Sequence, residues 1–61
     1  MSIDEFYAAV NQLGLRPSTV PHVYVCLANG EHHNVPDATK YSPEDRGRII
    51  AKLTTLVRGY C

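Results

Sequence analysis

The feature that most constrains this chain is a β-hairpin signal at its centre, bounded by Pro21 and Pro36. Residues 22–27 alternate and are rich in β-branched and aromatic side chains, and residues 28–30 read Ala-Asn-Gly, which is typical of a tight hairpin turn. The second strand is expected to stop at Pro36, because proline cannot donate to a strand ladder. Any helix must therefore precede or follow the hairpin.

A first helix is predicted before the hairpin. Ser2 and Glu5 form a capping-box pattern, so the helix is expected to begin at Ile3, and Gly14 supplies the residue that commonly ends a helix. Its apolar face consists of Ile3, Phe6, Val10 and Leu13. Leu15 is expected to fold back onto this face, and residues 16–21, which contain two prolines and no period, are expected to form an extended connector.

A second helix is predicted after the hairpin and after a loop over residues 37–41. Ser42 is the expected cap and Pro43 the first helical residue, and the helix should run to about Arg58 and end at Gly59. Its apolar stripe consists of Ile49, Ile50, Leu53, Leu56 and Val57.

These elements predict one α+β domain over residues 1–61, built as helix, two-stranded antiparallel hairpin, helix (αββα) in two layers. A two-stranded sheet is marginal alone, and a chain this short buries only about 60% of its unfolded surface. The cysteines, Cys26 and Cys61, allow one bridge at most. We therefore expect a homodimer, formed either by pairing hairpin edges into a four-stranded sheet or by exchanging helices.

The hairpin register depends on the turn. A two-residue loop would put Val35 opposite Tyr24, whereas a three-residue loop with a bulge at Gly30 would put Val35 opposite Val23. We favour the longer loop, because it gathers the aliphatic side chains on the core face. The other face then carries the candidate binding residues His22, Tyr24, Cys26, His32 and Asn34.

This polar face places the Cys26 thiol across from His32, a pairing found in nucleophilic cysteine sites. The sequence offers no oxyanion element and no third group to orient the imidazole, so we expect a noncatalytic protein. The adjacent His32 and His33 must point to opposite faces of a strand, and no Cys-x-x-Cys pair is present. Neither a metal nor a cofactor is therefore expected.

The net charge is zero, which argues against gross electrostatic capture of nucleic acid or anionic membrane. The charge is unevenly distributed, with −4 over residues 1–45 and +4 over residues 46–61. Acids at the start and bases at the end of the last helix suit its dipole. Arg46, Arg48 and Lys52 form a candidate basic helix face.

Residues 30–33, Gly-Glu-His-His, followed by Val35-Pro36-Asp37, resemble the hairpin of HicA-type messenger-RNA interferase toxins. Those toxins are similarly short, open with a helix and carry a functional histidine on a strand. They have glycine-serine-histidine at this place, a third strand after it and a basic surface. Here Glu31 replaces the serine, a third strand is not evident and the net charge is zero. The resemblance implies His32 as a catalytic residue.

The chain begins with acids instead of a basic region and has no apolar run of membrane-spanning length, so we expect a cytoplasmic protein without a membrane partner. The predicted function is that of a small noncatalytic interaction protein, self-associating and able to bind a protein partner. The alternative is a HicA-like RNA-binding protein or ribonuclease.

Overall fold

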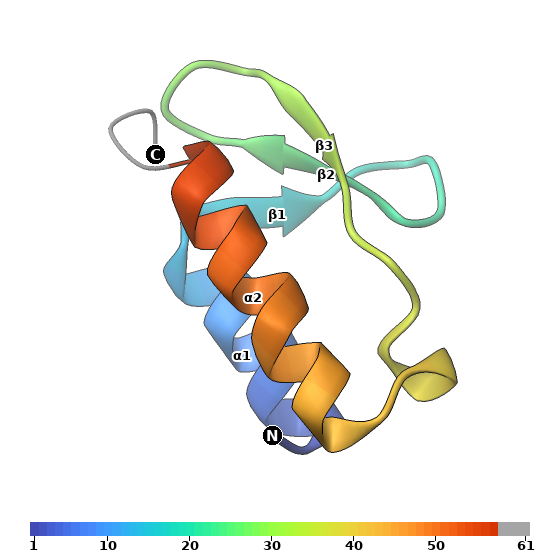
Figure 1. Ribbon diagram of the computed structural model, residues 1–61. Helices are drawn as coiled ribbons and strands as arrows, with labels where there is room; N and C mark the ends of the chain where they lie inside the picture. Colours follow the sequence, from blue (N-terminus) through green and yellow to red (C-terminus); the bar gives the residue numbers. More distant parts are fainter. Residues whose placement is uncertain (58–61) are drawn as a thin grey trace.

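Two helices pack on one side of a three-stranded antiparallel sheet in a computed structural model that describes residues 1–57 (Figure 1). The elements are α1 (Ile3–Gln12), β1 (Leu15–Pro17), β2 (Val23–Cys26), β3 (His32–Asn34), a 3-10 turn η1 (Ala38–Lys40) and α2 (Pro43–Val57). The strand order is β1-β2-β3. The α+β class and the helix–sheet–helix order are confirmed, but the two-stranded sheet is wrong.

The additional strand, β1, comes from the segment that the sequence predicts as a connector. Gly14 has a φ of 86°, which turns the chain back directly after α1. The Leu27 amide then donates to the Gly14 carbonyl at 3.2 Å, and the Ser18 amide donates to the Val23 carbonyl at 3.0 Å. Pro17 is tolerated because β1 is an edge strand, where one side of the backbone needs no partner.

The capping box of α1 is confirmed. The Ser2 hydroxyl accepts from the Glu5 amide at 3.1 Å, and the Glu5 carboxylate accepts from the Ser2 amide at 2.8 Å. At the start of α2, the Ser42 hydroxyl accepts from the Asp45 amide at 3.2 Å. The predicted end of this helix at Arg58 and Gly59 lies outside the described residues.

Both registers considered for the hairpin are wrong. Cys26 and Glu31 close a four-residue loop, in which the Gly30 amide donates to the Cys26 carbonyl at 2.7 Å and the Cys26 amide donates to the Glu31 carbonyl at 2.8 Å. Val25 consequently lies opposite His32, and Tyr24 lies opposite His33. The favoured register is displaced by one residue, which exchanges the two faces of β3 relative to the prediction.

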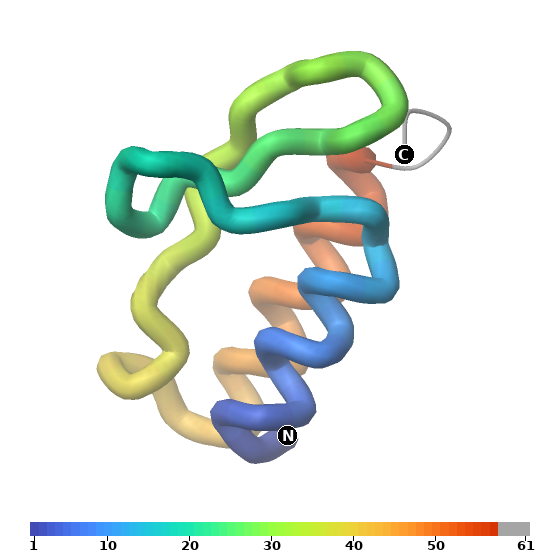
Figure 2. Tube along the Cα trace, turned by 180° about the vertical axis from the view of Figure 1, so that it is seen from behind, coloured from blue at the N-terminus to red at the C-terminus, as the bar shows by residue number. Residues whose placement is uncertain are grey.

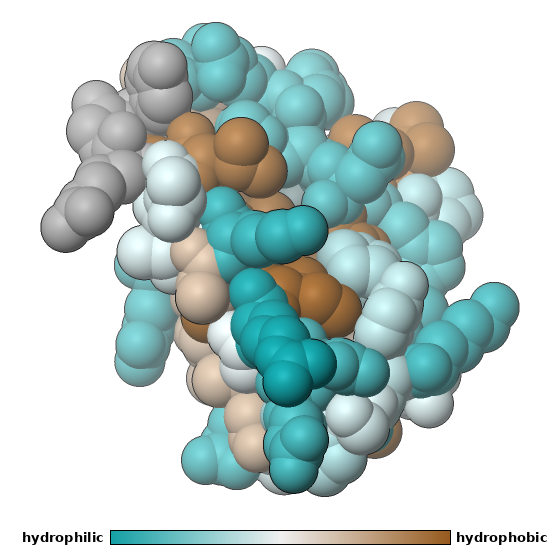
Figure 3. All heavy atoms as spheres, viewed as in Figure 1, coloured by the Kyte–Doolittle hydropathy of each residue, from teal (hydrophilic) through white to brown (hydrophobic). Residues whose placement is uncertain are grey.

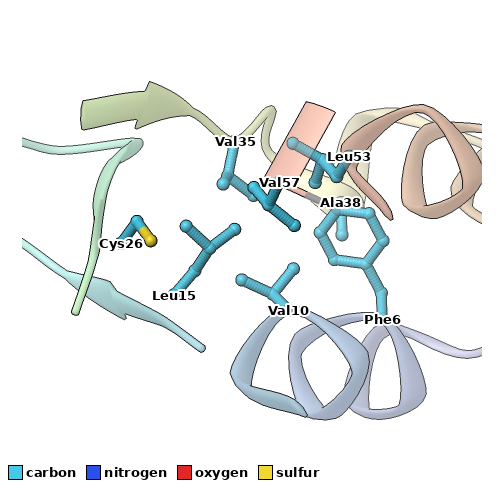
Figure 4. Close-up of a cluster of buried hydrophobic side chains, with 8 residues drawn as sticks. All are labelled: Phe6, Val10, Leu15, Cys26, Val35, Ala38, Leu53 and Val57. Atoms are coloured by element: carbon cyan, nitrogen blue, oxygen red, sulfur yellow. The ribbon is translucent and has the colours of Figure 1, made fainter. Parts of the chain in front are cut away.

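The core lies between the covered face of the sheet and the two helices (Figure 4). Its buried members are Phe6, Val10, Leu15, Cys26, Val35, Ala38, Leu53 and Val57. Leu56, which the sequence placed in the apolar stripe of α2, is 58% exposed instead. None of the helices among residues 1–57 has the length and apolar character that crossing a bilayer requires.

The helices run in the same direction, with their N-terminal ends side by side (Figures 1 and 2). The N-terminal ammonium group of Met1 donates to the Pro43 carbonyl at 3.4 Å. Arg46 of α2 joins further segments at this end of the molecule, because its guanidinium donates to the carbonyls of Ala38 at 2.8 Å and Met1 at 3.3 Å. Segment 35–41 is thereby held along α2.

Candidate functional site

The predicted binding face is divided between the two sides of the sheet. Strand alternation and the observed pairing put Tyr24, Cys26 and His33 on the covered face, toward the helices. His32 and Asn34 lie on the uncovered face. Because Cys26 is fully buried and His32 is exposed on the other side, the expected thiol–imidazole pair does not form.

The polar groups on the covered face are packed against the core. Burial raises the pKa of Tyr24, and the nearby Tyr7 phenol raises it further. The Tyr7 hydroxyl accepts from the Ala38 amide at 3.3 Å, which ties α1 to η1. His33 is half-buried, and its Nε2 lies 3.7 Å from a Glu31 carboxylate oxygen without a hydrogen bond. The bond between Tyr7 and Ala38 therefore connects two elements that lie far apart in the sequence.

The uncovered face is mixed in character. It consists of Arg16, Val23, Val25, His32 and Asn34. The two valines are half-buried and the other three side chains are exposed. The Arg16 guanidinium folds back and donates to the carbonyls of Asn11 at 2.9 Å and Leu15 at 3.0 Å.

The two edges of the sheet differ in how many backbone amides and carbonyls they offer to a further strand. On either side of β3, backbone hydrogen bonds join Glu31 to Cys26 and Val35 to His22. Hydrogen-bonded and non-hydrogen-bonded pairs alternate along an antiparallel ladder, so the amides and carbonyls of His32 and Asn34 point away from β2. In β1, the outward-pointing residues are Leu15 and Pro17. Pro17 has no amide hydrogen, and the Leu15 carbonyl already accepts from Arg16. Within residues 1–57, only the β3 edge therefore presents both amides and carbonyls that have no partner strand.

A groove of about 360 Å³ lies along α2, and we call it the α2 groove. It is lined by Tyr41, Asp45, Arg48, Ile49 and Lys52. Figure 3 shows this side of the molecule, with apolar brown surface between strongly hydrophilic teal side chains. Sequence reasoning identified its two cations but missed Tyr41 and Ile49 as their neighbours, because the position of residue 41 depends on η1.

The predicted basic helix face is thus divided as well. Arg48 and Lys52 line the α2 groove, whereas Arg46 is half-buried and bound to backbone carbonyls. The Arg48 guanidinium lies 3.1 Å from the Asp45 carboxylate. No hydrogen bond or ion pair joins Lys52 to residues 1–57, so its charge is available to a ligand.

His22 has a backbone conformation that the sequence did not indicate. Its φ of 62° is the only positive φ of a non-glycine residue in the described part of the chain. The His22 carbonyl accepts from the Val35 amide at 2.8 Å, which fixes the start of β2 beside the end of β3. The exposed imidazole of His22 also helps to lower the pKa of Asp37, after the larger effect of hydrogen bonds from Thr39.

No three potential ligands among the histidine, cysteine, aspartate and glutamate side chains of residues 1–57 come together in a group that could hold a metal ion. Comparison with known proteins gives no further lead: no family model matches the chain. Curated proteins and solved structures likewise give no significant match.

Proposed function

We propose that this protein is a small noncatalytic interaction protein that self-associates through the edge of β3. The observation that carries the proposal is the difference between the two sheet edges. The β3 edge presents the amides and carbonyls of His32 and Asn34, while Pro17 and Arg16 block much of the β1 edge. An unblocked strand edge is a template for pairing with another strand.

A two-fold axis through His33 would satisfy this edge. In an antiparallel pair of β3 strands, His32 of one copy would lie opposite Asn34 of the other, and each such pair would exchange two hydrogen bonds. The sheet would then continue through both copies in the order β1-β2-β3-β3-β2-β1. This arrangement corresponds to the edge-paired alternative from the sequence, with three strands per copy instead of two.

The expected dimer is weak. Four hydrogen bonds contribute about 2–6 kcal/mol in total, at roughly 0.5–1.5 kcal/mol each. Association costs at least about 4 kcal/mol in translational and rotational freedom. The gain and the cost are of similar size, so we expect a dimer that appears only as the protein concentration is raised.

Sedimentation equilibrium at several concentrations up to about 1 mM tests the proposal. Asn34→Pro removes an outward amide without removing a bond to β2, so it should abolish the concentration-dependent dimer. Asn34→Ala retains the amide and is the matched control. A wild-type protein that stays monomeric throughout, or an Asn34→Pro variant that still dimerises, would refute edge pairing. Circular dichroism checks that both variants are folded.

A HicA-like RNA-binding protein or ribonuclease is the second candidate, and one observation favours it: His32 is exposed on β3. The third strand departs from the pattern of those toxins, because it precedes the hairpin. The test is cleavage of single-stranded RNA by the wild type and by His32→Ala, together with retention on heparin at rising salt. Absence of both cleavage and retention would eliminate this candidate.

A further inference from the structure

We propose that the α2 groove binds a short acidic and apolar segment of a partner protein. The groove shares no residue with the β3 edge, so this proposal goes beyond self-association. Its basis is the combination of an apolar floor with cationic side chains on one side of one helix.

The apolar part of the α2 groove consists of Tyr41 and Ile49. Tyr41 is 41% exposed, and Ile49 is half-buried against the core. A volume of about 360 Å³ lies near the lower end of the range of roughly 300–1,000 Å³ for ligand pockets. The groove therefore has room for one or two apolar side chains of a peptide.

The charged side chains of the α2 groove favour a ligand that carries only one or two negative charges. Arg48 and Lys52 are four residues apart, so they project from the same side of α2. Asp45 offsets one of these charges, because it lies 3.1 Å from the Arg48 guanidinium. The lining residues consequently have a net charge of +1, which suits one or two carboxylates.

The small number of cations in the α2 groove disfavours single-stranded nucleic acid as its ligand. Two cations could neutralise two phosphates, so the affinity would change with salt by a logarithmic slope of only about −1.4. Glu44 and Asp45 lie on the same first turn of α2 and would repel a longer phosphate backbone. A peptide can place its carboxylates opposite Arg48 and Lys52 while apolar side chains contact Tyr41.

The test uses a short fluorescein-labelled peptide of glutamate, leucine and glycine. A peptide with lysine in place of glutamate and an oligouridine RNA serve as comparison ligands. Fluorescence anisotropy measures affinity, and backbone amide chemical shifts locate the ligand. We expect saturable binding of the acidic peptide on the order of 100 µM, with shifts concentrated around Tyr41 and residues 45–52 of α2.

Lys52→Gln should weaken this binding about fivefold, since an exposed ion pair contributes up to about 1 kcal/mol. Tyr41→Ala should weaken it through loss of the apolar contact. Thr54→Glu lowers the net charge by the same unit but lies two residues further along, on the opposite side of the helix, so it is the matched control.

The proposal is overturned if the acidic peptide shows no saturable binding up to about 1 mM. It is also overturned if Lys52→Gln and Thr54→Glu weaken binding equally, or if the RNA binds the α2 groove and the acidic peptide does not. Asn34→Pro separates the two proposals, because it should abolish dimerisation and leave peptide binding unchanged.

Discussion

The two faces of the sheet contain similar side chains but have different environments. The covered face carries Leu15 and Cys26, which are almost completely buried, and Val35 extends it beyond β3. On the uncovered face, Val23 and Val25 remain half-buried although they are as apolar as Val35. Hydrophobicity alone therefore does not determine which side of this hairpin faces the helices.

The loop between β2 and β3 explains the difference. Four residues, Leu27–Gly30, separate the closing pair of Cys26 and Glu31. A loop one residue shorter would bring Val35 opposite Val23 and collect the valines on one side. In the observed register, β3 is instead turned so that His33 and Val35 face the core, and Val23 and Val25 are left opposite Asn34 and His32.

A matched pair of substitutions tests this comparison with the largest expected effect. Val35→Ala should lower the free energy of unfolding by about 2–3 kcal/mol, because it removes two buried methyl groups and leaves a cavity. Val25→Ala removes the same groups from the uncovered face and should cost less than about 1 kcal/mol. Urea unfolding of both variants measures the difference.

Equal losses for the two valine variants would contradict the difference in burial between the two faces. A larger loss at Val25 than at Val35 would contradict the observed register. Measurement at low protein concentration keeps self-association from contributing to the stability of either variant.

The elements near the ends of the chain could be predicted from sequence, because their determinants are local. Ser2, Glu5, Ser42 and Pro43 fix the helix starts through bonds or geometry within a few residues. The register could not be predicted in the same way, since the Ala-Asn-Gly sequence is compatible with loops of several lengths. β1 was missed because its pairing with β2 depends on contacts outside its own three residues.

Glycine substitutions test how strongly the turn determines the faces, with a smaller expected effect. Gly30 has a φ of 75° within the loop, so Gly30→Ala should cost about 1 kcal/mol, although the added methyl group meets no atom within 4 Å. Gly47 also has open space but lies inside α2. Gly47→Ala should therefore stabilise the protein by up to about 1 kcal/mol.

Thermal unfolding of the two glycine variants shows directly whether each substitution raises or lowers the stability. A destabilised Gly30→Ala variant with an unchanged amide spectrum in β3 would indicate that the register is retained under strain. Changed chemical shifts at Val35 and His33 would instead indicate that the register depends on Gly30. A stabilising effect of Gly30→Ala would contradict the left-handed conformation.

The candidate site was only partly predictable for the same physical reason. Arg48 and Lys52 follow from helical spacing, and the structure brings them to one groove. Tyr41 joins them because η1, a 3-10 turn, replaces the expected loop, and Arg46 leaves the group because its guanidinium binds the Ala38 and Met1 carbonyls. Both differences depend on where segment 35–41 packs, which a single sequence does not specify.

The smallest expected effect is on the pH dependence of stability, and it concerns the Asp37 carboxylate at the start of η1. Hydrogen bonds from the Thr39 hydroxyl at 2.7 Å and amide at 3.0 Å lower the pKa of Asp37, with smaller contributions from His22 and Lys40. The folded state therefore favours ionised Asp37. Its contribution to stability is complete above the pKa of the unfolded chain and is lost as the pH falls through the lower pKa of the folded state. Glu5, whose pKa is lowered by its bonds to Ser2, acts with the same sign.

Urea unfolding measured from neutral pH down to about pH 2 separates these two carboxylates. Asp37→Asn keeps an oxygen that can accept from the Thr39 amide but removes the titration, so its stability should fall less steeply at acidic pH than that of the wild type. The remaining slope should contain the contribution of Glu5. Parallel curves would mean that Asp37 has the same pKa in both states, and that Ala38 is held by packing, by the bond that its amide donates to the Tyr7 hydroxyl and by the bond that its carbonyl accepts from Arg46.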